Sequence, residues 1–355
     1  MANLSPLVKT APETKKIATA SQYTDTAALI NYISDHLPAI EHPLSEAATH
    51  HFAKPGKLLR AKMALKASKH LEIEKSAVLP WAAAIELLHN ASLIHDDICD
   101  GDTLRRGRPS VWFKYGRDTA LMLGDWLIAL SFELAGEAAQ RSATPLLVKI
   151  LADQMQLTTV GEARGLDIQR TIDWEGYVDL AADKTAPLLT APLRGIMAMH
   201  HGNSEDDDAS MTVDAYFRCL GSAYQIANDI LNFQGNDGAE AQASDLGRRA
   251  PNAVTLIYRH MLPAPEQMHF DEWYRSGCNS ALDYWQDKII GSSAMKTASR
   301  RMHGIFNESG RLAEELPVGL DEIIYPLHLM VKQVCEKSVV ALSVIRGNAG
   351  QYPLV

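Results

Sequence analysis

The segment Val78–Leu93 is almost entirely apolar, contains no glycine, and has its one proline, Pro80, near its start. Such a run indicates a helix buried in a core rather than an amphipathic helix on a surface. Helix-length apolar patterns recur at residues 25–37, 42–52, 57–70, 77–98, 117–139, 143–162, 174–200, 210–233, 251–262, 267–287, 291–314 and 319–346, and strand-like alternation is nearly absent. We therefore predict an all-α fold, a large helical bundle whose sites are built from side chains of facing helices.

The chain has 355 residues, of which 46% are hydrophobic, so it can bury a large core. We expect a single domain over residues 23–355. Residues 1–22 are rich in Ser, Thr, Ala, Pro and Lys without helical periodicity, and we expect them to form a disordered leader. Aromatic residues at helical spacing between 269 and 285 are predicted to pack in the core.

Charge and cysteine content narrow the range of partners. The net charge is −9 and the pI is about 5.8, which argues against nucleic acid because no basic stripe is present to neutralise phosphates. The four cysteines lie far apart without a CxxC pattern, so we expect neither a disulfide framework nor a zinc site. We find neither a signal-peptide pattern nor about 18 consecutive apolar residues, and we expect a cytoplasmic protein with no transmembrane segment.

The apolar helix ends in an acidic cluster. At 3.6 residues per turn, Asp96 and Asp100 share one helix face and Asp97 lies beside them. Carboxylates this close repel one another unless a cation lies between them, and hard oxygen ligands favour Mg²⁺, which takes further ligands from substrate phosphates. Arg105 and Arg106 follow and could clamp a diphosphate. The alternative is a solvated helix end that forms salt bridges with these arginines.

The string SLIHDDICDGDTLRRGRPS, residues 92–110, resembles the first aspartate-rich motif of the trans-isoprenyl diphosphate synthases, the polyprenyl synthetase family. This resemblance implies that Asp96, Asp97 and Asp100 hold Mg²⁺ against the diphosphate of an allylic substrate, which leaves as pyrophosphate. It also implies an isoprenoid synthase-type bundle with a central active-site cavity, and a homodimer.

A second basic pair precedes this motif. Gly56-Lys57-Leu58-Leu59-Arg60 is expected to open a helix with Lys57 and Arg60 on one face. The stretch resembles the family's GKRxRP motif, which implies that Lys57, Arg60, His89 and Arg106 bind isopentenyl diphosphate. The alternatives are two surface bases and a histidine satisfied within the core.

The second half carries weaker matches. Gly161-Glu162 resembles the family's GE motif, and Asp183-Lys184-Thr185 resembles its KTA segment, which implies that Lys184 and Thr185 contact the allylic diphosphate. Residues 225–233, QIANDILNF, resemble the second aspartate-rich motif, QxxDDxxDF, with Gln225 binding substrate. Two of its aspartates are asparagines here, so the implied metal ligands are Asn228, Asp229 and Asn232. The site loses two formal negative charges, and its Mg²⁺ affinity should fall.

The next family segment, KxxGxDLxxGKxT, is also changed. Asp245 and Leu246 remain, but Ala250 and Asn252 stand at the positions of the usual lysine and threonine. Arg248 or Arg249 could replace the missing cation.

The resemblance implies condensation of dimethylallyl, geranyl or farnesyl diphosphate with isopentenyl diphosphate to a longer all-trans prenyl diphosphate. Ser92 and Ala91, one turn before Asp96, are small, and Leu88 is the first large residue below them, so we expect geranylgeranyl diphosphate as the product. Two alternatives stay open: a terpene cyclase-like or acceptor prenyltransferase that ionises an allylic diphosphate without elongation, and a non-catalytic regulatory subunit of a heteromeric synthase.

Overall fold

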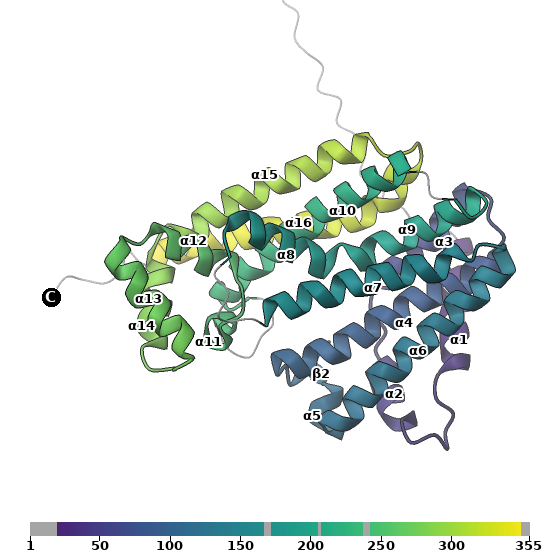
Figure 1. The fold of residues 1–355 in the computed structure, drawn as a ribbon, viewed down its shortest axis with the longest axis horizontal. Helices are drawn as coiled ribbons and strands as arrows, with labels where there is room; N and C mark the ends of the chain where they lie inside the picture. Colours follow the sequence, from purple (N-terminus) through teal and green to yellow (C-terminus); the bar gives the residue numbers. More distant parts are fainter. Residues whose placement is uncertain (1–19, 167–171, 205–206, 237–241, 349–355) are drawn as a thin grey trace, which may run out of the picture.

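The computed structural model describes residues 20–166, 172–204, 207–236 and 242–348 (Figure 1). Its helices are α1 Ala20–His36, α2 Ser45–Phe52, α3 Leu59–His70, α4 Lys75–Asp100, α5 Val111–Tyr115, α6 Arg117–Ser142, α7 Leu146–Gly165, α8 Trp174–Thr185, α9 Pro187–His200, α10 Asp207–Gln234, α11 Ser244–Arg248, α12 Ala253–Met261, α13 Ala264–Ser276, α14 Leu282–Gly291, α15 Ala294–Glu314 and α16 Leu320–Asn348. Two-residue strands, β1 Leu104–Arg105 and β2 Arg108–Pro109, pair antiparallel. The all-α prediction is confirmed.

Some predicted boundaries were wrong. The segment 174–200 forms two helices because Pro187 starts a new one, and the segment 267–287 is divided after Gly277, whose φ is +65°. The five-residue helices α5 and α11 are too short to give a periodic apolar signal. Residues 1–19 of the expected leader lie outside the described residues, and Ala20 already belongs to α1.

The predicted buried helix is α4, which packs along α6 and also contacts α1, α3 and α9. Trp81 and Ile85 of α4 are fully buried. A Cβ added to Gly195 of α9 would lie 2.2 Å from the ring of Trp81, so only glycine allows this ring to pack against the α9 backbone. The central helix is therefore surrounded on several sides, as its apolar sequence predicts.

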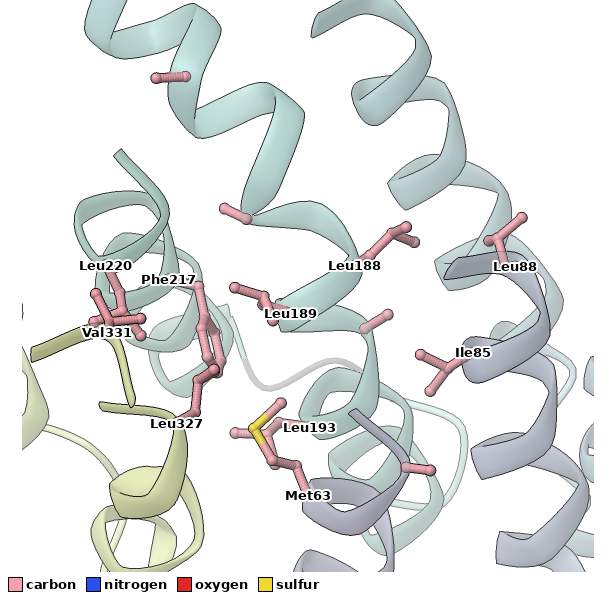
Figure 2. Packing of buried hydrophobic residues seen from close by; sticks show 14 of the residues in the cluster. Met63, Ile85, Leu88, Leu188, Leu189, Leu193, Phe217, Leu220, Leu327 and Val331 are labelled. Carbon is pink, nitrogen blue, oxygen red and sulfur yellow. The ribbon is translucent and has the colours of Figure 1, made fainter. Parts of the chain in front are cut away.

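The second half of the chain packs around α10, which contacts α8, α9, α15 and α16. Figure 2 shows Phe217 and Leu220 of α10 close to Leu327 and Val331 of α16. One hydrophobic cluster runs from Leu29 of α1 to Cys335 of α16, and the single domain over residues 23–355 stays a prediction.

Most aromatic residues of α13 and α14 pack as core side chains, as expected, but Tyr284 is 51% exposed. Phe270, Trp273 and Trp285 are buried and contact one another, with ring centroids 5.0 to 5.8 Å apart. Arg249, between α11 and α12, places its guanidinium 4.0 Å from the ring of Trp273. The aromatic cluster thereby fixes the segment that enters the candidate site from α11.

Candidate active site

A cavity of about 340 Å³ lies among α4, α6, α7, α8, α9, α10 and the segment 245–251. On α4 its lining runs from Leu88 through Ser92 to Asp96 and Asp100, about one turn per step. Apolar residues of three other helices, Ile128, Met155 and Leu188, also line it. Figure 2 shows Leu188 of α9 and Leu88 of α4 among the buried residues. The volume is within the range of ligand pockets, about 300–1,000 Å³.

Charged groups of three helices meet at the C-terminal end of α4. Asp96 and Asp100 line the cavity together with Glu162 of α7 and Lys184 of α8, and Lys184 Nζ lies 2.9 Å from Glu162 Oε2. Burial and the nearby Glu162 carboxylate raise the pKa of Asp96 to about 7. Burial acts to lower the pKa of Lys184, but Glu162, Asp100 and Asp96 outweigh it and raise that pKa, which keeps the lysine charged.

Gly161 explains how the Glu162–Lys184 pair forms. A Cβ at residue 161 would lie 2.7 Å from the Lys184 backbone nitrogen and 2.8 Å from the Asp183 carbonyl carbon. The backbones of α7 and α8 therefore touch here, and the next residue, Glu162, stands beside Lys184. In the GE pair, Gly161 allows α7 to approach the backbone of α8, and Glu162 forms the ion pair with Lys184.

Asp97 differs from its neighbours because it does not line the cavity. Its carboxylate is 1% exposed, and its Oδ1 accepts a hydrogen bond of 2.7 Å from Arg105 Nε. Burial raises the pKa of Asp97 to about 6, although Arg105 opposes the shift. The Oδ2 atom of Asp97 is buried without a hydrogen-bond partner among the described residues. Arg105 is therefore engaged with the acidic motif itself.

The turn after α4 brings the two arginines back to it. Gly101 ends α4 with φ +71°, and the β1–β2 hairpin turns at Arg106 and Gly107, which have φ of +55° and +74°. Two successive positive φ values are typical of a type I′ hairpin turn. The RRG sequence thus builds a tight hairpin that returns its arginines to the end of α4.

The first acidic motif fits a divalent cation. A buried, unpartnered carboxylate oxygen on Asp97 and the raised pKa of Asp96 both mark negative charge for which the protein supplies no full compensation. No three His, Cys, Asp or Glu side chains in the described part of the chain already surround one point. Water and diphosphate oxygens would therefore complete the coordination shell of a bound Mg²⁺, as is usual for this ion.

The second motif does not fit a cation in the same way. Asp229 is 1% exposed, and its Oδ2 accepts hydrogen bonds from the Tyr177 hydroxyl and, at 2.6 Å, the Ala253 N–H. Its Oδ1 accepts one from Gln225 Nε2 at 3.1 Å. Burial raises the pKa of Asp229 while these hydrogen bonds oppose the shift. Both oxygens of this carboxylate already have protein partners.

The flanking asparagines take no position in the cavity lining either. The amide nitrogen of Asn232 donates to Ser244 Oγ at 2.8 Å, and its oxygen lies 3.4 Å from the Asp245 nitrogen. Asn228 is half-buried. Of this motif only Gln225 reaches the lining. Thr185 does not line the cavity and packs against Gly221 of α10, where an added Cβ would be 3.1 Å from the threonine Cβ.

A second cationic site lies on α3, α4 and the hairpin. Arg60, His89 and Arg106 lie close enough for the two arginines to lower the pKa of His89, which burial lowers most. Arg60 Nε is buried without a hydrogen-bond partner among the described residues. The backbone N–H of Ala61 donates to Glu86 Oε1 at 3.1 Å, so the buried Glu86 caps the start of α3 and lies near Arg60 and Arg106. Two arginines and a histidine thus converge here, and one of their donors, Arg60 Nε, has no partner among the described residues.

The expected placement of Lys57 was wrong. Leu58 has φ +52° and buries its side chain, so α3 begins only at Leu59. Lys57 precedes the helix, is exposed, and does not share a helix face with Arg60. The left-handed turn at Leu58 aims Arg60 inward and leaves Lys57 outside.

Two residues with clear roles in this geometry, Glu86 and Tyr177, were not predicted. Glu162 was named only as part of the GE motif, and Arg248 only as one of two arginines that could replace a missing cation. Glu86 is the one acidic residue in an apolar helical segment, which is a usable signal because a buried carboxylate needs partners. Tyr177 acts through a partner 52 positions away, and no local pattern reveals that contact.

Comparison with known proteins identifies the family of the chain. The model of the family described as polyprenyl synthetase matches residues 41–284, so the chain belongs to the polyprenyl synthetase family. It is 32% identical over 214 residues to a geranylgeranyl diphosphate synthase of Saccharolobus solfataricus, covering 58% of this chain and 62% of the relative. It is 32% identical over 202 residues to a short chain isoprenyl diphosphate synthase of Methanothermobacter thermautotrophicus, covering 56% and 60%. The chain thus spans about three fifths of the length of these curated relatives.

Solved structures share the fold. A decaprenyl diphosphate synthase from Rhodobacter capsulatus matches with a TM-score of 0.76 at 21% identity, covering 90% of this chain and 97% of the other. A polyprenyl synthase from Caulobacter crescentus, complexed with calcium and isoprenyl diphosphate, matches with a TM-score of 0.71 at 23% identity, covering 90% and 95%. At these identities the likeness establishes the all-α fold.

Proposed function

We propose that the protein is an Mg²⁺-dependent prenyltransferase that condenses an allylic diphosphate with isopentenyl diphosphate, giving a longer all-trans prenyl diphosphate and pyrophosphate. The observation that carries the proposal is the presence of two charged sites near the C-terminal half of α4. Asp96 and Asp100 face a cavity together with Lys184, while His89 meets Arg60 and Arg106 in a separate cationic cluster. Two diphosphate sites beside one apolar cavity suit a reaction that joins two prenyl diphosphates.

The family membership and the acidic end of α4 support a divalent metal, which we propose is Mg²⁺ held by Asp96 and Asp100 in the cavity, with the unpartnered Asp97 Oδ2 adding negative charge beside them. A bound metal would neutralise the allylic diphosphate as it leaves. Lys184, kept charged by its neighbouring carboxylates, adds a fixed positive charge on the same side. The apolar walls formed by Leu88, Met155 and Leu188 exclude water from the allylic cation.

Arg60, His89 and Arg106 would hold the diphosphate of isopentenyl diphosphate, so that its double bond attacks the cation. A proton is then lost to the departing pyrophosphate. Glu86, which caps the α3 start next to Arg60, would position that arginine. No protein nucleophile is needed in this scheme, and charged side chains of α3, α4, α8 and the β1–β2 hairpin supply binding, orientation and charge.

The cavity supports a product longer than fifteen carbons, and we propose geranylgeranyl diphosphate. Ser92 lines the cavity one turn below Asp96, and the next side chain of α4 in the lining is Leu88. Ala91 is fully buried and does not line the cavity, so of the two small residues one turn before Asp96 only Ser92 shapes the space for the product. Leu88, Ile128 and Leu188, from three helices, are proposed to set the limit.

The arrangement favours elongation over the two alternatives. A cyclase needs no second diphosphate site, whereas Arg60, His89 and Arg106 form a second cationic cluster that suits one. A non-catalytic subunit needs neither the unpartnered Asp97 oxygen nor the Glu162–Lys184 pair that lines the cavity.

Two helices, α4 and α6, are long and apolar enough to cross a membrane by length and composition alone. The apolar window of α4 is 78% buried inside the molecule, but that of α6 is only 44% buried. Leu121 and Met122 of α6 and Leu157 and Val160 of the adjacent α7 are between 43% and 51% exposed. We propose that a second copy of the chain covers this surface, giving a cytoplasmic homodimer.

The proposal is tested with purified protein, Mg²⁺ and farnesyl diphosphate, with and without isopentenyl diphosphate, and products identified by mass spectrometry. Elongation should require both substrates. The Arg60→Ala variant should lose elongation but keep slow hydrolysis of farnesyl diphosphate, because Arg60 lies outside the cavity that holds the allylic substrate. A cyclised or hydrolysed product formed equally well without isopentenyl diphosphate would refute elongation.

A further inference from the structure

Arg248, at the end of α11, joins the two acidic segments of the cavity. Its Nη1 lies 3.0 Å from Asp100 Oδ1 and donates to the Asp100 carbonyl at 2.7 Å. Its Nη2 lies 2.8 Å from Asp245 Oδ1. Arg248, Asp100 and Asp245 all line the cavity. The guanidinium therefore stands between the first acidic motif and the segment that follows the second.

Near Arg248, on the side of the second motif, few carboxylate oxygens are left free to bind a metal ion. Asp245 Oδ2 accepts a hydrogen bond of 2.9 Å from Asn252, and both oxygens of Asp229 are occupied. Asn228 and Asn232 carry no charge, so Asp229 is the one charged ligand left in the motif. A divalent cation placed here would gain little attraction and would be repelled by a permanently charged guanidinium.

The adjacent arginine does not serve the same purpose. Arg249 is 3% exposed and donates to the carbonyls of Leu246 and Cys278, at 2.6 and 2.7 Å. Its stacking on Trp273 fixes the chain next to Arg248 and holds that side chain in register with the cavity. Both arginines line the cavity, but the guanidinium of Arg249 is taken up by backbone carbonyls, whereas that of Arg248 faces the carboxylates of Asp100 and Asp245 and its side chain is 33% exposed.

We propose that Arg248 is a resident cation that takes the place of a metal ion at the second acidic motif and binds the diphosphate of the allylic substrate directly. The proposal rests on the proposed function only in taking a diphosphate as the ligand. It explains why the loss of two aspartates coincides with a guanidinium that spans both acidic segments. The protein then needs divalent metal only at the first acidic motif, where Asp96 and Asp100 line the cavity.

The test counts metal ions rather than product. Mn²⁺ is titrated into the protein in the presence of inorganic pyrophosphate, and bound Mn²⁺ is counted by electron paramagnetic resonance. Asp96→Asn should lower the number bound, and Asn228→Ala should leave it unchanged. The triple variant Arg248→Gln, Asn228→Asp, Asn232→Asp should bind more Mn²⁺ than wild type. A wild type that loses an ion on Asn228→Ala would overturn the proposal.

A second measurement addresses the anion. Pyrophosphate binding in the presence of EDTA should weaken by about tenfold or more in Arg248→Gln, the cost of one charged hydrogen-bonding group, and less in Arg248→Lys. Arg311→Gln is the matched control, since Arg311 also bridges two carboxylates, Glu308 and Glu315, but lies outside the cavity lining. Equal pyrophosphate binding by wild type and a folded Arg248→Gln would refute direct binding. Neither readout depends on prenyl transfer, so failure of elongation alone leaves these results interpretable.

Discussion

The guanidinium of Arg106 lies where a side chain on Gly56 would stand, since a Cβ at residue 56 would be 2.9 Å from Arg106 Nη2. Arg106 Nη1 also donates to the Lys54 carbonyl at 3.0 Å, so the loop before α3 holds this arginine beside Arg60 and His89. Gly56, the glycine of the GKLLR stretch, thus leaves the space that the guanidinium of Arg106 occupies, although the two residues are distant in sequence.

Gly56→Ala should displace Arg106 and raise the KM for isopentenyl diphosphate, with a smaller effect on the KM for farnesyl diphosphate. The reason is steric, because the added methyl occupies the guanidinium's place. Gly136→Ala on α6 is the control, since nothing lies within 4 Å of a Cβ there. Equal increases in both KM values would place Arg106 outside the isopentenyl diphosphate site.

Asp96→Asn and Asp97→Asn should both abolish ionisation of the allylic diphosphate, but they should differ in stability. Replacing Asp97 leaves the Arg105 guanidinium without the carboxylate that it binds, although burial raises the pKa of Asp97 to about 6 and so offsets part of that loss. Asp96 has a pKa raised by burial and Glu162, so neutralising it relieves that penalty. Urea unfolding should show Asp97→Asn as the less stable variant; the reverse order would contradict the pairing.

Ser92→Phe should shorten the product to fifteen carbons, because Ser92 lines the cavity one turn below Asp96. Ala91→Phe should instead destabilise the fold by about 1–3 kcal/mol without shortening the product, since Ala91 is buried in the core. Chromatography of the chain lengths formed by both variants separates these effects. Shortening by Ala91→Phe alone would show that the cavity follows another face of α4.

His51 makes stability depend on pH. Burial lowers its pKa to about 4, despite a hydrogen bond of 2.9 Å to Asn90 Oδ1. An unfolded histidine titrates near pH 6.5, so below that pH the unfolded chain binds the proton more readily. The contribution of neutral, buried His51 to the free energy of unfolding is therefore fully present above pH 6.5 and is lost as the pH falls towards 4. Between pH 7.5 and 5.5 the free energy of unfolding should fall by roughly 1 kcal/mol from this group.

The control for this effect compares how steeply the free energy of unfolding depends on pH in wild type and in two histidine variants. His51→Gln should flatten the dependence of the free energy of unfolding on pH, whereas His200→Gln, at an exposed position, should leave it as in wild type. Equal slopes in wild type and His51→Gln would show that His51 takes up its proton in the folded protein.

Local patterns predicted much of this molecule. The apolar segment 78–93 identified the central helix, and its acidic end identified the cavity side chains Asp96 and Asp100, because helical spacing alone puts these two on one face. Helical spacing did not predict the role of Asp97, because its partner Arg105 is brought to it by a hairpin turn. Spacing predicts which residues share a face, but it does not reveal which distant partner each one binds.

The second motif illustrates the limit more sharply. The sequence showed that two aspartates are asparagines, but the consequence depends on Tyr177, Ala253 and Arg248, which come from three other segments. The predicted placement of Lys57 on the helix was wrong for a local reason: Leu58 has a left-handed backbone conformation, which the pattern of side chains does not encode. Such backbone exceptions and long-range hydrogen bonds are what the folded structure adds.

The most direct test of the central claim is the ratio of pyrophosphate released to isopentenyl diphosphate consumed, measured with farnesyl diphosphate and Mg²⁺ in one reaction. Condensation releases one pyrophosphate for each isopentenyl diphosphate that joins the chain, so the account predicts a ratio of about 1 and no turnover by Asp96→Asn. Release of pyrophosphate while isopentenyl diphosphate remains unconsumed would contradict it.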